Sequence, residues 1–239
     1  MIAGPCGAES EDQLIDTAKQ LASVNHVSLL RAGVWKPRTR PGAFEGHGEN
    51  ALRWLQAMRE ETKLPFTVEV ANTEHVELAL KYNADVLWIG ARTSVNPFSI
   101  QEIADALKGT DIPVLVKNPI NADLQLWIGA LERFNRSGIK KLGAIHRGFH
   151  TGVNSQYRNQ PKWEIPIALK SACPDLPVIC DPSHICGRRD ILLATAQKAL
   201  DLNMDGLMIE VHRDPATALS DAAQQLTPKL FEEMLDKLV

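Results

Sequence analysis

Eight short apolar runs, separated by stretches of helical periodicity, constrain the fold of this 239-residue chain more than any other feature. The runs are β-branched or aliphatic throughout and do not alternate with polar residues, as expected for parallel strands covered on both faces. Eight strands alternating with helices predict a closed (β/α)8 barrel, whereas an open doubly wound sheet would more usually have fewer repeats. The runs are 1–5, 27–31, 66–70, 86–90, 114–117, 142–146, 177–181 and 207–211.

The segments between the runs carry the spacing and the end signals of helices. Residues 11–24 place apolar side chains on one face, behind a capping box formed by Ser10 and Gln13. Another helix is expected to begin at Ser99, and Thr227 is expected to cap the last helix, with a proline in its first turn. No repeat or linker interrupts the pattern, so we expect one domain that spans residues 1–239.

Composition and charge exclude several classes of function. The chain is 44% hydrophobic and 23% charged, as in an ordinary soluble globular protein. A net charge of −3 argues against a nucleic-acid partner, because no large basic face is implied. No apolar run is long enough to cross a bilayer, and no signal peptide is visible. The four cysteines lie far apart and are expected to be reduced, which predicts a cytoplasmic protein without a membrane partner.

Nearly every apolar run ends at a polar or charged residue for which a core strand has no structural use. Barrel enzymes place their chemistry at the carboxyl ends of the strands, because the side chains there converge on one mouth. Two long polar loops, 32–48 and 147–161, follow runs on this same face, and such loops in compact domains are usually functional or disordered. The residues at the ends of the runs are Cys6, Arg31, Glu69, Arg92, Lys117, His146, Arg147, Asp181, His184, Glu210 and His212.

Basic residues are concentrated at this predicted mouth. A single arginine is more often a solvated charge or half of a surface ion pair, but six at one mouth of a mildly acidic protein are hard to assign to chance. Guanidinium groups match carboxylate and phosphate oxygens, so the cluster predicts two small anionic substrates that carry phosphate. The six residues are Arg31, Lys36, Arg38, Arg92, Lys117 and Arg147.

A second set of residues has the donor types of a transition-metal site. Cys6, His184 and Glu210, with Asp221 as a further candidate, combine soft, borderline and hard donors that suit Mn, Fe, Co or Zn and do not suit Ca or Mg. Their spacing is no local metal signature, and Cys6 taken alone is more typical of a buried apolar residue. For His212 the sequence favours neither a ligand role nor a structural role. Structural, surface or loop positions are expected for Cys173, Cys180, Cys186, His26, His47, His75 and His150.

Eight short motifs, in order along almost the whole chain, resemble those of the 3-deoxy-D-arabino-heptulosonate 7-phosphate (DAHP) synthase family, in its compact type I-beta-like form. A single matching tripeptide would be weak evidence, but eight motifs that match in the same order are specific to a family. The motifs are Gly4-Pro5-Cys6, Lys36-Pro37-Arg38-Thr39, Gly90-Ala91-Arg92-Thr93, Lys117-Asn118-Pro119, His146-Arg147-Gly148-Phe149, Asp181-Pro182-Ser183-His184, Ile209-Glu210-Val211-His212 and Ser220-Asp221.

The resemblance implies a metal-dependent transferase, 3-deoxy-7-phosphoheptulonate synthase. Such an enzyme condenses phosphoenolpyruvate with D-erythrose 4-phosphate and water to give DAHP and phosphate, the first step of the shikimate pathway to aromatic amino acids. The implied ligands of the divalent metal ion, which would be Mn, Fe, Co or Zn, are Cys6, His184, Glu210 and Asp221.

The resemblance also implies roles for the remaining residues. Arg38 and Thr39 would receive erythrose 4-phosphate, Glu69 would orient the water that adds to phosphoenolpyruvate, and Asp181 would position the aldose or the metal-bound groups. Lys36 and Lys117 would serve both binding and catalysis. The groups implied to grip phosphoenolpyruvate are Arg31, Lys36, Arg92, Lys117 and Arg147.

Relatives also suggest how the chain is organised in the cell. We expect a homo-oligomer, with a dimer favoured, and we consider association or fusion with a chorismate mutase in the full-length protein. The present sequence is expected to contain neither a regulatory domain nor a chorismate mutase domain. Feedback inhibition by aromatic amino acids is not predicted from this sequence.

Three alternatives stay open at this point. A 3-deoxy-octulosonate 8-phosphate synthase shares the barrel and the phosphoenolpyruvate chemistry but uses arabinose 5-phosphate, and it typically reads KANRS where this chain has the 36–39 motif. A Schiff-base aldolase would instead use Lys117 as its nucleophile. A barrel that only binds phosphate is the non-enzymatic alternative, which would have no need of Cys6.

Overall fold

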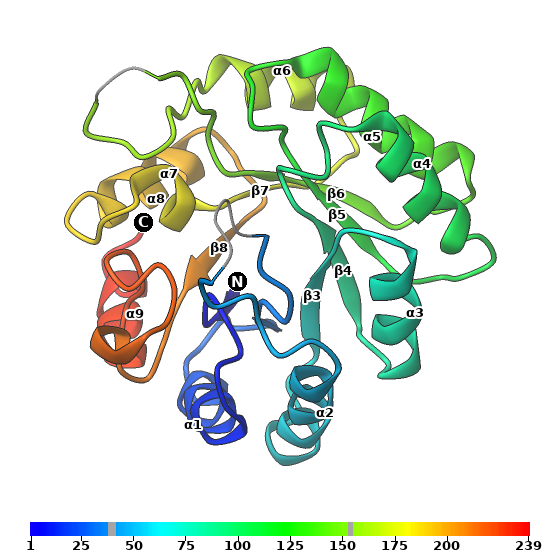
Figure 1. Ribbon diagram of the computed structural model, residues 1–239. Coiled ribbons are helices and arrows are strands. Elements are labelled where there is room, and N and C mark those ends of the chain that lie inside the picture. Colours follow the sequence, from blue (N-terminus) through cyan, green and yellow to red (C-terminus); the bar gives the residue numbers. More distant parts are fainter. Residues whose placement is uncertain (38–41, 153–154) are drawn as a thin grey trace.

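The computed structural model describes residues 1–37, 42–152 and 155–239, and its eight strands close into a parallel barrel in the order of the sequence (Figure 1). Strand β1 pairs with both β2 and β8, which closes the ring. The predicted (β/α)8 barrel is therefore confirmed. The strands are β1 Ile2–Gly4, β2 Leu29–Arg31, β3 Phe66–Val70, β4 Val86–Ile89, β5 Val114–Lys117, β6 Leu142–His146, β7 Val178–Cys180 and β8 Gly206–Glu210.

Helices surround the strands as an outer layer (Figure 1). Among the described residues, no helix is both long and apolar enough to cross a membrane. The helices are α1 Glu11–Ala22, α2 Glu49–Thr62, α3 Thr73–Lys81, α4 Pro97–Ala106, α5 Leu124–Arg136, α6 Glu164–Ala172, α7 Pro182–Cys186, α8 Leu192–Asp201 and α9 Pro228–Leu235, with a 3₁₀ turn at Pro215–Thr217.

Two hydrophobic clusters hold the layers together. One consists of strand residues alone and therefore fills the inside of the barrel, with Trp88 as its largest member, beside Ile2, Leu29, Ile145 and Met208. The other packs the outer faces of the strands against the helices, and its large, fully buried members include Leu14, Leu52, Phe66, Trp127 and Phe231. The strands thus bury both faces, which explains why their sequences do not alternate.

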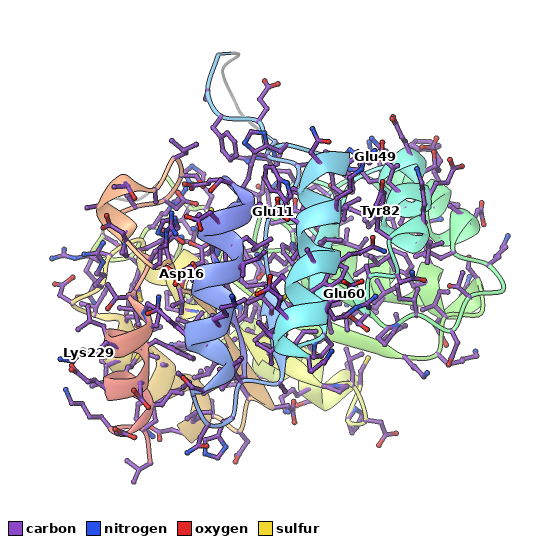
Figure 2. The ribbon with its side chains drawn as sticks, turned by 90° about the horizontal axis from the view of Figure 1, so that it is seen from below. Glu11, Asp16, Glu49, Glu60, Tyr82 and Lys229 are labelled. Carbon is purple, nitrogen blue, oxygen red and sulfur yellow. The ribbon has the colours of Figure 1, made fainter. Side chains whose placement is uncertain are left out.

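Charged residues cover the outside of the helical layer. Figure 2 shows Glu11 and Asp16 on α1 and Glu49 and Glu60 on α2, two helices that lie side by side. Glu49 accepts hydrogen bonds of 2.7 Å from Lys81 and from the Tyr82 hydroxyl, which ties α2 to α3. Exposed pairs of this kind contribute at most about 1 kcal/mol each, so the buried clusters carry the stability.

The helix starts agree in part with the sequence prediction. Ser10 caps α1 and accepts from the Gln13 amide at 3.1 Å, but the Gln13 side chain accepts from the Glu9 amide and not from that of Ser10. Thr227 caps α9 as expected. The predicted start of α4 at Ser99 is wrong by two residues, because Asn96 is the cap and accepts from the Ser99 amide.

The short helix α7 was not predicted as a helix. Asp181 caps it, accepting from the His184 amide at 3.1 Å, and Pro182 occupies the first turn, where a proline is tolerated. The turn fixes the direction of His184 immediately after β7. A loop at this position would hold that side chain less rigidly.

His146 makes the stability of the fold depend on pH. The side chain is fully buried beside Trp163 and Phe149, and burial, with Arg147 nearby, lowers its pKa from 6.5 to about 3. Between these two values the unfolded chain binds a proton that the folded chain does not, so stability falls as the pH falls. At about pH 5.5 this should cost on the order of 1 kcal/mol relative to neutral pH.

Urea unfolding of the wild type and of His146→Phe at about pH 7.5 and about pH 5.5 measures this contribution. We expect the wild type to lose on the order of 1 kcal/mol more than the variant on acidification. Equal losses in both proteins would show that His146 does not remain neutral in the folded state.

Candidate active site and metal centre

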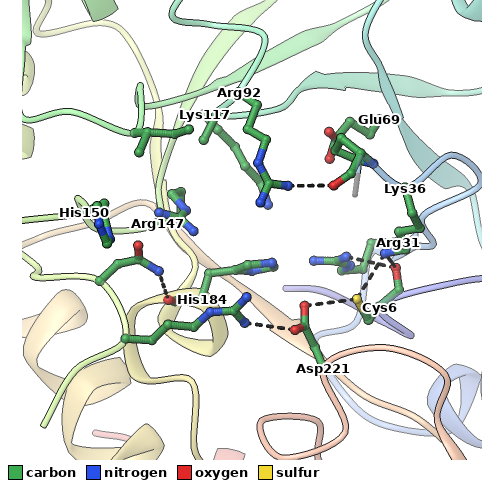
Figure 3. A pocket seen from close by; sticks show the side chains of 15 residues that line it. Cys6, Arg31, Lys36, Glu69, Arg92, Lys117, Arg147, His150, His184 and Asp221 are labelled. Atoms are coloured by element: carbon green, nitrogen blue, oxygen red, sulfur yellow. Dashed lines mark hydrogen bonds and ion pairs between the residues drawn. The ribbon is translucent and has the colours of Figure 1, made fainter. Parts of the chain in front are cut away.

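A cavity of about 640 Å³ opens at the carboxyl ends of the strands (Figure 3). Most residues that the sequence analysis singled out lie on its wall, although they come from different strands and loops. Arg38 and Thr39 lie outside the described residues, and Glu210 and Asp181 are fully buried next to residues of the wall. The predicted residues that line the cavity are Cys6, Arg31, Lys36, Glu69, Arg92, Lys117, Arg147, His184 and Asp221.

Three of the four predicted metal ligands lie together. One ligand atom each from Cys6, Glu210 and Asp221 falls within 4.8 Å of the other two, and the Cys6 thiol lies 3.4 Å from Asp221 Oδ2. His184 is outside this group, but its Nε2 lies 3.7 Å from Glu210 Oε1. The four groups come from the end of β1, from α7, from the end of β8 and from the loop that follows β8.

The orientation of these groups fits a divalent cation. Asp181 Oδ2 lies 2.8 Å from His184 Nδ1, which favours the tautomer whose free Nε2 faces Glu210. Glu210 Oε1 is buried and has no hydrogen bond within the described part of the chain, although it lies 3.1 Å from an Arg31 nitrogen. Sulfur, imidazole and carboxylate donors together match a first-row transition metal.

The protonation of Cys6 responds to its surroundings. Burial and the neighbouring Glu210 raise the pKa of the thiol to about 11, while the Lys36 ammonium, 3.0 Å from the sulfur, acts in the opposite direction. A metal ion would displace the thiol proton, because the thiolate is the ligand form. Burial opposes ionisation of Asp221 too, but Arg158 and His184 lower its pKa to about 2.

Two buried cations lie beside the metal-ligand group. Arg31 is 2% exposed, and its Nε and Nη1 atoms have no hydrogen-bond partner among the described residues. Lys117 donates to Asp181 Oδ2 at 3.0 Å. Both cations lie over the indole ring of Trp88. Arg31 Cζ is 5.2 Å from the ring centre and Lys117 Nζ is 5.7 Å from it, which allows cation–π contacts.

Arg147 and Arg92 extend the positive charge along the cavity (Figure 3). Burial lowers the pKa of Arg147 to about 10, and the cations Arg158 and Arg92 add to this effect. Arg92 donates to the carbonyl of Pro37, which belongs to the 36–39 motif, at 2.8 Å. Cations that repel one another in a partly desolvated cavity are stabilised by a bound anion, so this part of the site suits phosphate or carboxylate groups.

Glu69 is held at the cavity wall by two features of β4 and its end. The Trp88 indole donates to Glu69 Oε2 at 2.8 Å. Gly90 lies against the same carboxylate, and a Cβ atom there would be only 2.1 Å from Oε1. Only glycine leaves this space free, so the Gly90-Ala91-Arg92 motif shapes the pocket for Glu69 as well as supplying Arg92.

Sequence reasoning missed several residues that reach the site. Arg158 lines the cavity and binds Asp221, and its only signal was its position in the long loop 147–161. Gln224 donates to Glu210 Oε2 at 2.6 Å, and nothing in the sequence marked it. His150, expected in a loop, is exposed and lines the cavity, while the undecided His212 is buried and lies 3.6 Å from Glu9.

Comparison with known proteins gives the same family as the motifs. The model of the DAHP synthetase I family matches residues 1–239. The chain belongs to this family. Over 238 residues it is 31% identical to the phospho-2-dehydro-3-deoxyheptonate aldolase of Thermotoga maritima, covering 100% of the chain and 68% of that enzyme. The resemblance to the DAHP synthase family is thereby confirmed.

Solved structures support the fold as well. The crystal structure of the Thermotoga maritima DAHP synthase has a TM-score of 0.86 at 30% identity, covering 99% of the chain and 66% of that protein. A truncated form of DAHP synthase from the same organism has a TM-score of 0.83 at 28% identity, covering 99% of the chain and 83% of that protein. The chain thus spans about two thirds of the length of the longer Thermotoga protein.

Proteins with the alternative activity are more distant. The 2-dehydro-3-deoxyphosphooctonate aldolase of Syntrophotalea carbinolica is 27% identical, covering 98% of the chain and 89% of that enzyme. That of Synechococcus sp. is 24% identical. The heptulosonate family therefore remains the better match.

The geometry of the ligand group predicts the effect of removing its sulfur. Cys6→Ala should abolish stoichiometric binding of Co²⁺ or Mn²⁺, because the remaining donors lose the thiolate that selects a transition metal. Cys173→Ala, at the end of α6, is the matched control and should bind metal like the wild type. Equilibrium dialysis of metal-free protein measures both. Full metal binding by Cys6→Ala would exclude Cys6 as a ligand.

Proposed function

We propose that the chain is a metal-dependent DAHP synthase, which condenses phosphoenolpyruvate with erythrose 4-phosphate and water. The proposal rests on one observation: the cationic part of the cavity is in direct contact with the metal-ligand group. Arg31 is buried, and two of its guanidinium nitrogens have no hydrogen-bond partner in residues 1–37, 42–152 and 155–239. It lies 3.1 Å from Glu210, which belongs to the metal-ligand group. The names of the Thermotoga maritima relatives support the same activity.

Phosphoenolpyruvate would occupy the cationic part of the cavity. Its carboxylate and phosphate can each accept hydrogen bonds from guanidinium and ammonium groups that otherwise repel one another. Fixing both anionic ends would hold C3, a weak carbon nucleophile, in one orientation towards the aldehyde. The residues that we assign to this task are Arg31, Lys36, Arg92, Lys117 and Arg147.

Cys6, His184, Glu210 and Asp221 would hold the divalent metal ion. When bound, the ion supplies Lewis-acid polarisation of the aldehyde oxygen, which draws off charge as the C–C bond forms. Asp181 would keep His184 in the ligand tautomer and, through its contact with Lys117, would join this site to the cationic part of the cavity. We leave the choice among Mn, Fe, Co and Zn open, because such mixed sites follow metal availability as well as preference.

Glu69 would act on the water molecule. Bond formation at C3 leaves cationic character at C2 of phosphoenolpyruvate, and water adds there before phosphate leaves. Glu69 lies on the wall of the cavity with its carboxylate held by Trp88, so it would orient that water and accept its proton. Lys117 and Arg31 would stabilise the anionic groups throughout.

The aldose would enter beside the 36–39 motif. Lys36 and Pro37 line the cavity, and Arg92 binds the Pro37 carbonyl, so the motif begins at the wall of the site. We therefore assign Arg38 and Thr39 to the phosphate end of erythrose 4-phosphate. The same motif favours the four-carbon aldose over arabinose 5-phosphate.

The environment of Lys117 argues against Schiff-base chemistry. A Schiff-base lysine must be free to attack a carbonyl carbon, but Lys117 Nζ is engaged by the Asp181 carboxylate at 3.0 Å. A barrel that only binds phosphate would have no use for the group of Cys6, Glu210 and Asp221.

Release of phosphate from phosphoenolpyruvate tests the proposal. We expect release that requires erythrose 4-phosphate, is much slower with arabinose 5-phosphate, is lost with a chelator and returns with added divalent metal. Borohydride should trap no adduct on Lys117. Activity that survives metal removal, together with a borohydride adduct, would contradict the proposal and favour an aldolase.

Three expectations about the cellular context stay predictions. These are a cytoplasmic location, a homo-oligomer with a dimer favoured, and association or fusion with a chorismate mutase. The described barrel is proposed to be the catalytic domain.

A further inference from the structure

We infer that Gln224, Gln225 and Arg158 are positioning residues that hold the metal-ligand side chains in place through hydrogen bonds outside the ligand group. The inference deepens the proposed function, because it rests on the assignment of Cys6, Glu210 and Asp221 as ligands. All three positioning residues lie on loops that follow β6 or β8. None of them was singled out by its sequence context.

Gln224 connects Glu210 to Arg158. The side chain is 1% exposed, and its Nε2 donates to Glu210 Oε2 at 2.6 Å. Its Oε1 accepts from Arg158 Nη1 at 2.9 Å. Both ends of a buried amide are therefore used, as its desolvation requires. Glu210 is therefore fixed through Oε2, while its Oε1 lies 3.7 Å from His184 Nε2.

Gln225 connects the end of β1 to the loop that carries Asp221. It is fully buried, and its Oε1 accepts from the Cys6 amide at 2.9 Å. Its Nε2 donates to the Ser220 carbonyl at 2.9 Å, immediately before Asp221. The backbone positions of Cys6 and Asp221 are therefore coupled, although 215 residues separate them in the sequence.

Arg158 connects Asp221 to the helix that carries His184. Its Nη1 donates to Asp221 Oδ1 at 2.9 Å, while its backbone amide donates to the Cys186 carbonyl at 3.3 Å. The next residue, Asn159, donates to the His184 carbonyl at 2.7 Å. A Cβ atom at Gly187 would lie 2.6 Å from that of Arg158, so this close approach requires glycine.

The network divides the oxygens of each carboxylate between two tasks. Gln224 holds Glu210 Oε2, whereas Oε1 has no hydrogen bond to any residue that the structure describes and lies next to His184. Arg158 holds Asp221 Oδ1, whereas Oδ2 lies next to the Cys6 thiol. One oxygen of each group is thus fixed and the other points at the ligand cluster, which is how outer hydrogen bonds orient metal ligands.

The backbone conformation of Asp221 also indicates that its surroundings hold this residue in place. Its φ of 49° lies in the left-handed region, which is uncommon for a residue other than glycine. Such a conformation persists where the surroundings over-determine it. The bond from Arg158 and the tie of Gln225 to Ser220 supply those surroundings.

Titration of the metal-free protein with Co²⁺ tests the inference without relying on turnover. The absorption bands of bound Co²⁺ report a thiolate ligand, and the titration gives the affinity. Gln224→Met keeps the length of the side chain and removes its hydrogen bonds. We expect the affinity to fall roughly 10- to 100-fold, with changed bands, as for other outer ligand partners. Gln20→Met, on the exposed face of α1, is the matched control and should bind like the wild type.

Arg158 provides a second variant that does not threaten the core, because its side chain is 47% exposed. Arg158→Met should weaken Co²⁺ binding. Arg158→Lys should restore part of the loss, because it keeps a charged donor near Asp221 but lacks the guanidinium group, whose Nη1 donates to both Asp221 and Gln224. The KM for phosphoenolpyruvate should change little in Gln224→Met, since that side chain does not line the cavity.

The outcomes separate this inference from the proposed function. Wild-type affinity, within about twofold, in both Gln224→Met and Arg158→Met would overturn the inference while leaving the metal site intact. If wild-type protein shows no thiolate bands with Co²⁺, the ligand assignment fails, and both the inference and the metal-dependent mechanism fail with it. Should Gln224→Met not fold, as judged by circular dichroism, the Arg158 pair decides.

Discussion

The arrangement of the mouth depends on the ion pair between Arg31 and Glu210, whose side chains are 2% and 0% exposed. Removing one partner of such a pair leaves a buried charge without compensation and costs about 3–5 kcal/mol. An apolar pair of similar volume would often stabilise a protein at least as well. Retaining two charges at this depth is therefore better explained by what they bind than by stability.

A second buried ion pair at the same mouth repeats the arrangement. Lys117 contacts Asp181, and Asp181 contacts His184. In both pairs a cation that faces the anion-binding region is joined to a group of the candidate metal centre. The two parts of the site are therefore separate in chemistry but share their carboxylates. The closed barrel makes this possible, because it brings the carboxyl ends of all the strands to one rim.

Much of the fold could be read from the sequence, because parallel strands buried on both faces leave continuous apolar runs. All eight strands lie where these runs predicted them, within two residues at each end. The residues at the strand ends converge as barrel geometry requires, which is why Arg31, Lys117 and Glu210 could be named. Asp221 was only a further candidate until its motif supported it, since it lies in an irregular loop.

The features that the sequence did not predict depend on the paths of loops and on single helical turns. The helix α7 is one turn long and is set by the Asp181 cap, so no periodicity marks it. Gln224, Gln225 and Arg158 meet the ligands only because the loops after β6 and β8 fold over the same rim. Glutamine and arginine are common on surfaces, and their burial or pairing here has no local signal.

The central claim is that one rim holds a metal ion and an anionic substrate on opposite sides of the Arg31–Glu210 pair. Anomalous diffraction from crystals of the protein soaked with Mn²⁺ and phosphoenolpyruvate tests this directly. The account predicts one ion bound by Cys6, His184, Glu210 and Asp221, with the phosphate and carboxylate on Arg31, Lys117 and Arg147. An ion bound away from Cys6 and Glu210, or phosphoenolpyruvate outside this cavity, would contradict it.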